Sequence, residues 1–134
     1  MRPSFVEIYT NLAEALSKRS TCKRMSVGCV ITSPDFSQVY GIGYNGNAKG
    51  LGNGCDRDEP GNCGCLHAEE NALLKVGVPS YVEKVAFVTH QPCEYCAKRF
   101  INKGGFVKIY YKLPYRKVEG LELLRKAGIE VEQV

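Results

Sequence analysis

The sequence predicts a three-layer α/β fold with a mixed β-sheet, and two patterns in the chain lead to that expectation. In the second half, short apolar runs alternate with segments of helical periodicity, in the order strand–helix–strand–helix–strand. Connections of this kind join parallel strands, almost always with right-handed topology. In the first half, a short turn separates two apolar runs, which indicates an antiparallel hairpin. The sheet is therefore expected to be antiparallel at its first hairpin and parallel at its last strands.

The first half of the chain is expected to contain one helix and two strands. Residues 27–32 form an apolar run that ends at a Ser-Pro-Asp turn, and residues 39–44 form its partner. Cys29 lies within the first run and is expected to be a core residue. Pro3 stands near the start of the predicted helix, where its missing N–H costs little. The apolar residues of that helix recur at helical spacing: Phe5, Ile8, Tyr9, Leu12, Ala15 and Leu16.

A long loop is expected over residues 45–64, which contain six glycines. A loop of this length inside a small domain is usually functional or bound to metal. Beyond it, glycines that follow helical periodicity predict where the helices end. His90 is expected on the loop that follows the third strand. The helices are expected at 67–75, 94–103 and 118–127, and the strands at 85–88, 106–111 and 129–134.

Length and composition predict one globular domain over residues 1–134, with 44% apolar and 24% charged residues. The net charge of +4 is mild, and no block of like charges marks a nucleic-acid-binding arm. The N-terminus lacks the apolar stretch of a signal peptide, and no segment has the length of a membrane span. We therefore expect a cytoplasmic protein with neither membrane nor nucleic-acid partners. Without a secretion signal, the seven cysteines indicate metal ligation more than disulfides.

The strongest chemical signal is His-Ala-Glu at residues 67–69 followed by Pro-Cys-Glu-Tyr-Cys at residues 92–96. His67, Cys93 and Cys96 are candidate ligands, and Glu69 is a carboxylate that is not a ligand. Structural zinc sites are closed by four protein ligands, so this set describes an open, catalytic site. Cys93 and Cys96 share one face at a predicted helix start, where the helix dipole favours thiolate. The order H-x-E, then P-C-x-x-C, is typical of zinc-dependent cytosine and adenine deaminases.

These residues predict a hydrolytic deamination. Zinc lowers the pKa of a bound water toward neutrality. Glu69 is expected to take the proton of that water, which attacks C4 of a cytosine ring. The same carboxyl is then expected to deliver protons to the ring nitrogen and to the leaving ammonia.

Other interpretations of the motif remain open. A thioredoxin-like redox pair would use Cys93 and Cys96 but would leave the His-Ala-Glu segment unexplained. A non-catalytic structural zinc module needs a fourth ligand, for which His90 is the nearest candidate. A deaminase of polynucleotides needs a groove of aromatic and basic residues, and this chain has no tryptophan. A deaminase of free nucleosides, or of another heterocycle, would use the same zinc chemistry.

The sequence resembles the zinc-dependent deoxycytidylate (dCMP) deaminases of the cytidine deaminase superfamily along nearly its whole length. The resemblance implies a three-layer α/β/α cytidine deaminase-like domain with a five-stranded mixed sheet in the order 2-1-3-4-5. It also implies hydrolysis of dCMP to dUMP and ammonia, which supplies dUMP for thymidylate synthesis. The segments that carry it are Arg19–Cys22, Val27–Gly28, Gly43–Gly46, Cys55, Cys63, Leu66–Glu69, Asn71–Ala72 and Pro92–Lys98, with Tyr111 and Tyr115 expected after the fourth strand.

The resemblance implies His67, Cys93 and Cys96 as zinc ligands and Glu69 as the proton shuttle. Asn45 would hydrogen-bond the deoxyribose hydroxyl, although Asn-Gly is also an ordinary turn pair. The backbone amide of Ala68 would meet the base. Tyr115 resembles a tyrosine that closes over the substrate, with packing at a strand end as the alternative. Arg24 and Arg116 are candidates for the 5′-phosphate, on the basis of charge.

Two departures from the family pattern stand near these residues. Glu70 adds a charge at the start of the helix that follows His67. Residues 89–92, Thr-His-Gln-Pro, are bulkier than the small residue usual before the cysteines. Neither departure changes a reacting group, but the second is expected to alter the shape of the pocket.

Four further cysteines are candidates for a second, structural zinc site. Thiolates suit zinc, and a site of four would be closed. Some dCMP deaminases have such a metal in this region. Cys22, Cys55 and Cys63 resemble its ligands, and Cys65 is the less regular member. The metal would order the long loop, whereas the alternative is a group of reduced, packed thiols. The four residues are Cys22, Cys55, Cys63 and Cys65.

The resemblance also implies assembly and regulation. Family members are typically hexamers that dCTP activates and dTTP inhibits. Gly43, Tyr44 and Gly46 lie in the segment that this regulation involves, and Mg²⁺ would accompany a triphosphate effector. The chain has no Walker-type phosphate loop, so this expectation depends on the resemblance alone.

Overall fold

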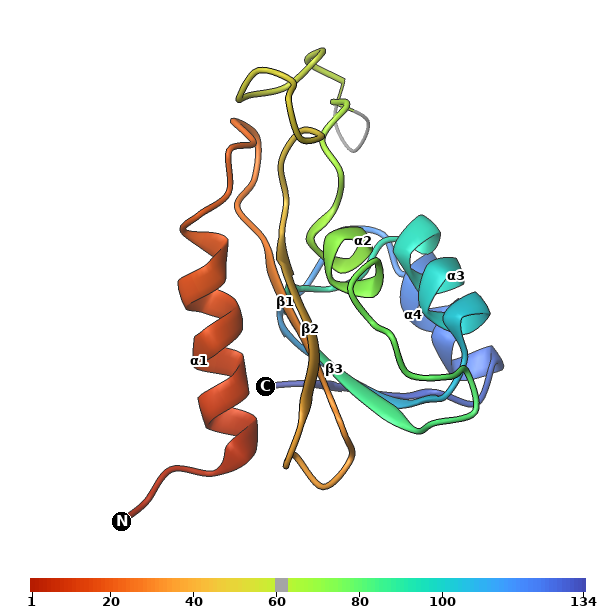
Figure 1. Cartoon of the computed structure of the whole chain (residues 1–134). Helices are drawn as coiled ribbons and strands as arrows, with labels where there is room; N and C mark the ends of the chain where they lie inside the picture. Colours follow the sequence, from red (N-terminus) through yellow and green to blue (C-terminus); the bar gives the residue numbers. More distant parts are fainter. Residues whose placement is uncertain (60–62) are drawn as a thin grey trace.

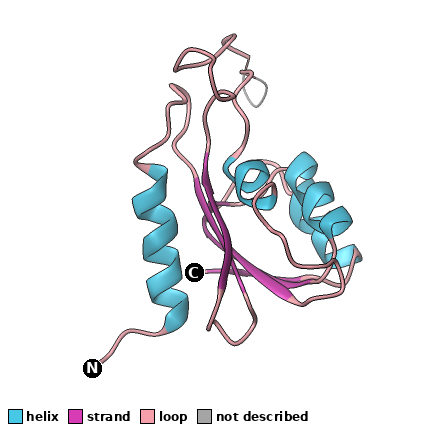
Figure 2. Cartoon of the chain, in the orientation of Figure 1, coloured by secondary structure: helices cyan, strands magenta, loops and turns pink. Residues whose placement is uncertain are grey.

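The computed structural model describes residues 1–59 and 63–134, and it has the three layers that the sequence predicts. A central sheet has α1 on one face and α2, α3 and α4 on the other (Figures 1 and 2). In the described part of the chain, none of the helices has the length and apolar character that a membrane span requires. The elements are α1 (Phe5–Ser17), β1 (Gly28–Thr32), β2 (Val39–Tyr44), α2 (Ala68–Leu73), β3 (Lys84–His90), α3 (Glu94–Lys103), β4 (Phe106–Leu113), α4 (Glu119–Lys126) and β5 (Glu130–Gln133).

The sheet has five strands in the order β2-β1-β3-β4-β5. β1 is antiparallel to both β2 and β3, whereas β3, β4 and β5 are parallel. The predicted strand order, the antiparallel first hairpin and the parallel last strands are therefore confirmed.

Two apolar cores, one on each face of the sheet, hold the layers together. Cys29 and Ile31 of β1 point toward α2 and α3 and pack with Phe100. Val30, between them, points to the other face and packs with Phe87 under α1. This alternation follows from the two-residue period of a strand. Cys29 is fully buried in the larger core, as predicted.

The strand ends lie within one residue of the prediction except at the C-terminal ends of β3 and β4, which extend to residues 90 and 113 instead of 88 and 111. His90 pairs with Leu113 in the β3–β4 ladder, so β3 continues to His90 and β4 continues to Leu113. His90 is thus the last residue of a strand and not part of the following loop. Tyr111 is a buried residue within β4 and does not follow it. Pairing with the neighbouring strand, which no local signal reveals, lengthens both elements.

The predicted loop between β2 and α2 extends beyond the end of the sheet, next to the segment between α1 and β1 (Figure 1). Gly46 and Leu66 form an isolated antiparallel bridge at its base. Residues 60–62 of this predicted loop, including Gly61, lie outside the described residues. The base of the loop directly precedes His67, so the bridge positions the start of α2.

Lys84, at the start of β3, is fully buried and binds the backbone around it. Its ammonium donates to the carbonyl oxygens of Pro79, Ser80, Val82 and Gly104 at 3.1, 3.4, 2.6 and 2.9 Å. Buried charges are tolerated when they are fully hydrogen-bonded. These contacts connect the loop before β3 to the end of α3.

Replacing Lys84 by methionine is expected to lower the free energy of unfolding by about 3 kcal/mol, because buried carbonyl groups lose a charged donor. Urea unfolding followed by circular dichroism measures the change. Lys126→Met, which removes an exposed lysine from α4, is the control, with an expected effect below about 0.5 kcal/mol. Equal stability of the two variants would contradict the structural role of Lys84.

Candidate active site

The three predicted ligand residues come together where α2 and α3 begin. His67 is the residue before α2, Cys93 is the residue before α3, and Cys96 lies in the first turn of α3. His67 Nδ1 lies 3.2 Å from Cys96 Sγ and 3.7 Å from Cys93 Sγ. One ligand atom from each of the three residues fits within 4.8 Å of the others. Two helix starts on the same face of the sheet therefore form one compact donor set.

The protonation of this set fits a zinc ion. Hydrogen bonds with Cys96 and His67 lower the pKa of the Cys93 thiol to about 4, against the effect of burial. The hydrogen bond with Cys93 raises the pKa of His67 to about 9, and the adjacent Cys93 raises the pKa of Cys96. Two thiols and an imidazole thus compete for protons in a small volume. A divalent cation relieves that competition, and sulfur and imidazole nitrogen are the donors that zinc prefers.

Glu69 lies beside the ligands but is not one of them. Its side chain is buried, with 5% of the residue exposed. Burial raises the pKa of the Glu69 carboxyl to about 7, while the positive charge of His67 opposes the rise. A carboxyl with a pKa near neutrality both accepts and returns a proton readily.

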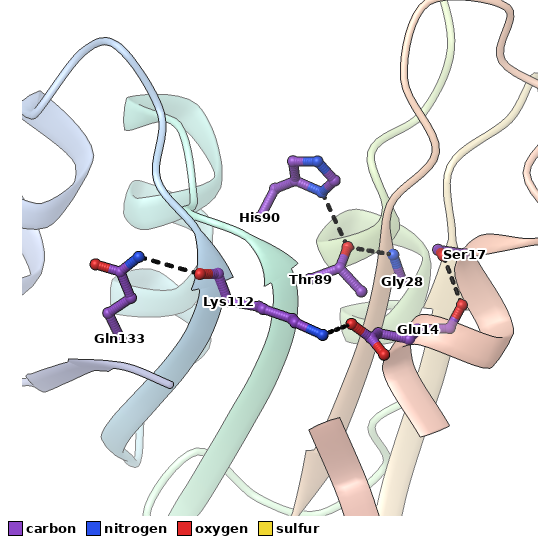
Figure 3. Close-up of polar contacts among 7 residues, drawn as sticks. All are labelled: Glu14, Ser17, Gly28, Thr89, His90, Lys112 and Gln133. Carbon is purple, nitrogen blue, oxygen red and sulfur yellow. Dashed lines mark hydrogen bonds and ion pairs between the residues drawn. The ribbon is translucent and has the colours of Figure 1, made fainter. Parts of the chain in front are cut away.

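His90, the nearest candidate for a fourth ligand, is engaged elsewhere. Its Nδ1 lies 3.0 Å from the hydroxyl of Thr89, which also accepts the N–H of Gly28 at 3.1 Å (Figure 3). Burial lowers the pKa of His90, which favours the neutral ring. Among residues 1–59 and 63–134, no fourth histidine, cysteine or acidic residue belongs to the His67 donor set. The geometry therefore favours an open site over a closed structural module.

A cavity of about 910 Å³ lies next to the three candidate ligands. His67, Cys93 and Glu69 line it, together with residues from the segments before β1 and after β4. Such a volume suits a small-molecule ligand. All five residues expected to bind substrate line this cavity: Arg24, Asn45, Ala68, Tyr115 and Arg116.

Asn45 has a structural role in addition to its predicted contact with the sugar. Its Oδ1 accepts the N–H of Val27 at 2.9 Å, and its Nδ2 donates to the carbonyl of Met25 at 2.6 Å. The carboxamide still has one N–H and one lone pair for a ligand. Asn45 is therefore more than a turn residue, because it holds the segment before β1 at the cavity wall.

The two predicted phosphate-binding arginines line the cavity from different segments of the chain. Arg24 donates to the carbonyl of Asp58 at 2.6 Å, which connects it to the long loop. The guanidinium of Arg116 lies 5.7 Å from the centre of the Tyr115 ring. Tyr115 is half-buried, two residues beyond the end of β4, and faces the cavity rather than only packing at a strand end. Both arginines thus line the cavity, and their contact with a phosphate stays a prediction.

Glu70 positions the start of α2. Its carboxylate accepts the backbone N–H of His67 at 2.9 Å and pairs with Arg99 at 3.2 Å. This is the return half of a capping box, in which an acidic residue three positions after the cap binds the cap N–H. The spacing of Glu70 from His67 was the sequence signal for this role, which the sequence analysis missed.

Gly120, another residue that the sequence analysis missed, lets α4 approach the ligands closely. A Cβ at Gly120 would lie 2.3 Å from the carbonyl oxygen of Pro92 and 3.0 Å from the carbonyl carbon of Cys93. Only glycine permits this contact between α4 and the segment that holds Cys93.

The three predicted effector residues do not line the cavity of the metal ligands. A Cβ at Gly43 would lie 2.4 Å from the carbonyl oxygen of Ala68, so this glycine allows α2 to pack against β2. The carbonyl of Tyr44 accepts from Asn71 at 2.8 Å. Gly46 forms the bridge with Leu66 described above. These contacts explain the residues by packing, and their effector role stays a prediction.

The four cysteines of the predicted second site also come together. Cys22 Sγ lies 3.5 Å from Cys55 Sγ and 3.7 Å from Cys63 Sγ, and Cys65 Sγ lies 3.8 Å from Cys55 Sγ. One sulfur from each fits within 4.8 Å of the others. Burial opposes the shift, but hydrogen bonds with the backbone of Arg24 and Met25 and with the thiols of Cys55 and Cys65 lower the pKa of Cys22 to about 7. Four convergent thiols have the chemistry of a closed zinc site.

Over residues 3–113 the chain matches the family described as the cytidine and deoxycytidylate deaminase zinc-binding region. The chain belongs to this family. The resemblance inferred from the sequence motifs is therefore confirmed, as is the cytidine deaminase-like fold.

Relatives within the family include proteins of several kinds. The deoxycytidylate deaminase of Saccharomyces cerevisiae is 35% identical over 99% of this chain, which spans 46% of the yeast protein. ComE operon protein 2 of Bacillus subtilis is 36% identical over 99% of the chain and 72% of its own length. The dCMP deaminase of cyanophage S-TIM5, solved in complex with dCMP and dUMP, has a TM-score of 0.86 and 36% identity, with 100% of this chain and 99% of the phage chain covered. This chain thus spans about half the length of the yeast enzyme and nearly all of the phage enzyme.

Proposed function

We propose that this member of the deaminase family hydrolyses dCMP to dUMP and ammonia. The observation that carries the proposal is the open His67–Cys93–Cys96 donor set with the buried Glu69 carboxyl beside it, inside a cavity that has arginines on its wall. The match to a phage dCMP deaminase over nearly the full length of both chains supports the nucleotide as substrate.

Metal binding, proton transfer and contact with the base are assigned to different residues of the site. His67, Cys93 and Cys96 would hold one Zn²⁺, which supplies a water of lowered pKa. Glu69 accepts a proton from the attacking water and returns protons to the ring nitrogen and to the amino group that leaves as ammonia. The backbone N–H of Ala68, in the first turn of α2, lacks a helical partner and is available to the base.

The walls of the cavity are suited to the rest of the nucleotide. Asn45 uses its remaining N–H or lone pair for the deoxyribose hydroxyl. Arg24 and Arg116 contribute positive charge for the 5′-phosphate, and Tyr115 covers the substrate. A planar guanidinium binds phosphate oxygens in pairs, which would discriminate dCMP from deoxycytidine.

Loss of cytosine absorbance tests the substrate, with dCMP, deoxycytidine and a cytosine-containing single-stranded oligonucleotide measured separately, with and without dCTP. Turnover of dCMP far above that of deoxycytidine supports the proposal. Turnover of only the oligonucleotide or only the nucleoside would keep the zinc chemistry and contradict the substrate. An increase in dCMP turnover with dCTP would support the predicted regulation, as would inhibition by dTTP.

We also propose a second, structural zinc on Cys22, Cys55, Cys63 and Cys65, supported by the convergence of their sulfur atoms. Purified protein is expected to contain about two zinc ions per chain, since one belongs to each donor set. Plasma emission spectroscopy measures the ratio, and Cys22→Ser is expected to reduce it to about one. A ratio near one in the unmodified protein would contradict the second site. Cys65→Ser tests whether the fourth thiol takes part.

We propose that the protein is a homo-oligomer, and the family resemblance implies a hexamer. Phe5, Ile8 and Leu12 support self-association because they share one side of α1 and remain 52%, 42% and 36% exposed. The mass in solution, measured by light scattering, tests this. The supply of dUMP for thymidylate synthesis, control by dCTP and dTTP with Mg²⁺, and the cytoplasmic location all stay predictions.

A further inference from the structure

Gln91 stands between the end of β3 and the ligand segment that begins at Pro92. It is a buried polar residue, with 6% exposed. A buried carboxamide needs hydrogen-bond partners, and those of Gln91 all belong to one other segment of the chain.

The contacts of Gln91 bracket the loop between β4 and α4. Its backbone N–H donates to the carbonyl of Leu113 at 2.8 Å, at the end of β4. Its side-chain Oε1 accepts the N–H of Tyr115 at 3.0 Å, and its Nε2 donates to the carbonyl of Lys117 at 2.7 Å. Because one partner is a donor and the other an acceptor, the orientation of the carboxamide is determined.

This loop contributes Tyr115, Arg116 and Lys117 to the wall of the cavity that holds the metal ligands. The C-terminal end of this loop also lies against the segment that holds Cys93, because α4 packs through Gly120 against the carbonyl of Pro92. A polar contact and a steric contact therefore connect the same loop to the residues next to Cys93.

We infer that Gln91 is a positioning residue that holds the loop of residues 114–118 at the distance from the metal ligands that a nucleotide requires. The inference rests on the proposed function for the identity of the substrate. Gln91 also lines the cavity, but both hydrogen bonds of its side chain go to the loop. It acts through Tyr115 and Arg116, which meet the sugar-phosphate side of the substrate, so its loss affects binding more than the chemical step.

Gln91→Met keeps the size of the side chain and removes both side-chain hydrogen bonds. We expect the amide of Tyr115 to exchange with deuterium about 10-fold faster or more, measured by NMR. KM for dCMP is expected to rise about 10-fold, with kcat changed less than about 3-fold and zinc content unchanged. Gln133→Met is the matched control, because it removes an exposed glutamine that donates to the carbonyl of Lys112 in β4 (Figure 3). This control is expected to change neither the exchange rate of the Tyr115 amide nor KM for dCMP.

Gln91→Glu is the second variant, which tests the inference if Gln91→Met does not fold. It keeps the acceptor for Tyr115 and loses the donor to Lys117, so the Tyr115 amide is expected to stay protected while KM rises. Unchanged exchange in a folded Gln91→Met protein would overturn the inference, and so would faster exchange with an unchanged KM. If the unmodified protein does not use dCMP, the proposed function fails separately, and the exchange measurement still decides whether Gln91 holds the loop.

Discussion

Glu69→Gln is expected to lower kcat for dCMP by about 10²–10⁴-fold while the protein keeps its catalytic zinc. Glutamine has nearly the same shape but neither accepts nor returns a proton at neutral pH. Glu69 is outside the donor set of His67, Cys93 and Cys96, so metal binding does not depend on its charge. Initial rates from loss of cytosine absorbance, together with zinc content, measure both effects.

The control for this variant is Glu122→Gln, the same change at an exposed position of α4. Its rate is expected to stay within about 2-fold of the unmodified protein. A Glu69→Gln protein with full turnover would exclude Glu69 as the proton shuttle. A variant that loses zinc as well would show that Glu69 supports the metal, and the fall in rate would then need another explanation.

Loss of a zinc ligand is expected to have the other large effect. Cys96→Ser replaces a fully buried thiol of the donor set by a hydroxyl, which is a poor zinc ligand. We expect about one zinc fewer per chain and a fall in turnover of more than about 10³-fold, because water is no longer activated. Metal analysis and initial rates of the same preparation measure the two quantities.

Metal removal from the unmodified protein tests the same requirement without a substitution. Dialysis against a chelator is expected to abolish turnover, and addition of zinc is expected to restore it. Turnover that persists in protein free of metal would contradict the zinc-dependent mechanism. A chelator would also remove zinc from the second site, which contains Cys22, and this loss could unfold the protein. Circular dichroism before and after dialysis therefore distinguishes loss of the catalytic metal from unfolding.

Local signals were sufficient for most of the fold and for the choice of candidate ligands. Pro92 before a predicted helix and glycines after helices placed α3 correctly at Glu94–Lys103. The apolar run with its turn placed β2 correctly at Val39–Tyr44. In contrast, β3 and β4 are longer than predicted, because His90 and Leu113 pair across the sheet and neither residue signals that pairing in its own segment.

The supporting residues of the site were harder to predict. Glu70 had a recognisable signal, namely its spacing from His67, whereas Gln91 had none. Gln91 binds Tyr115 and Lys117, which lie 24 and 26 residues further along the chain. Asn45 was predicted from resemblance as a sugar contact, yet its bonds to the segment before β1 became visible only in three dimensions.

The sequence by itself determined the types of donor present, the carboxyl that we propose transfers protons, and the order of helices and strands. These depend on residue identity and on periodicities of a few residues, which are local properties. Tertiary structure alone showed that the two helix starts bring ligand atoms of His67, Cys93 and Cys96 within 4.8 Å of one another, and that the sulfur atoms of four cysteines from distant segments converge. It alone also showed that the Gln91 side chain binds the loop between β4 and α4. Those relations depend on how the layers pack around the sheet, and the free energy of that packing comes from contacts between residues far apart in the chain.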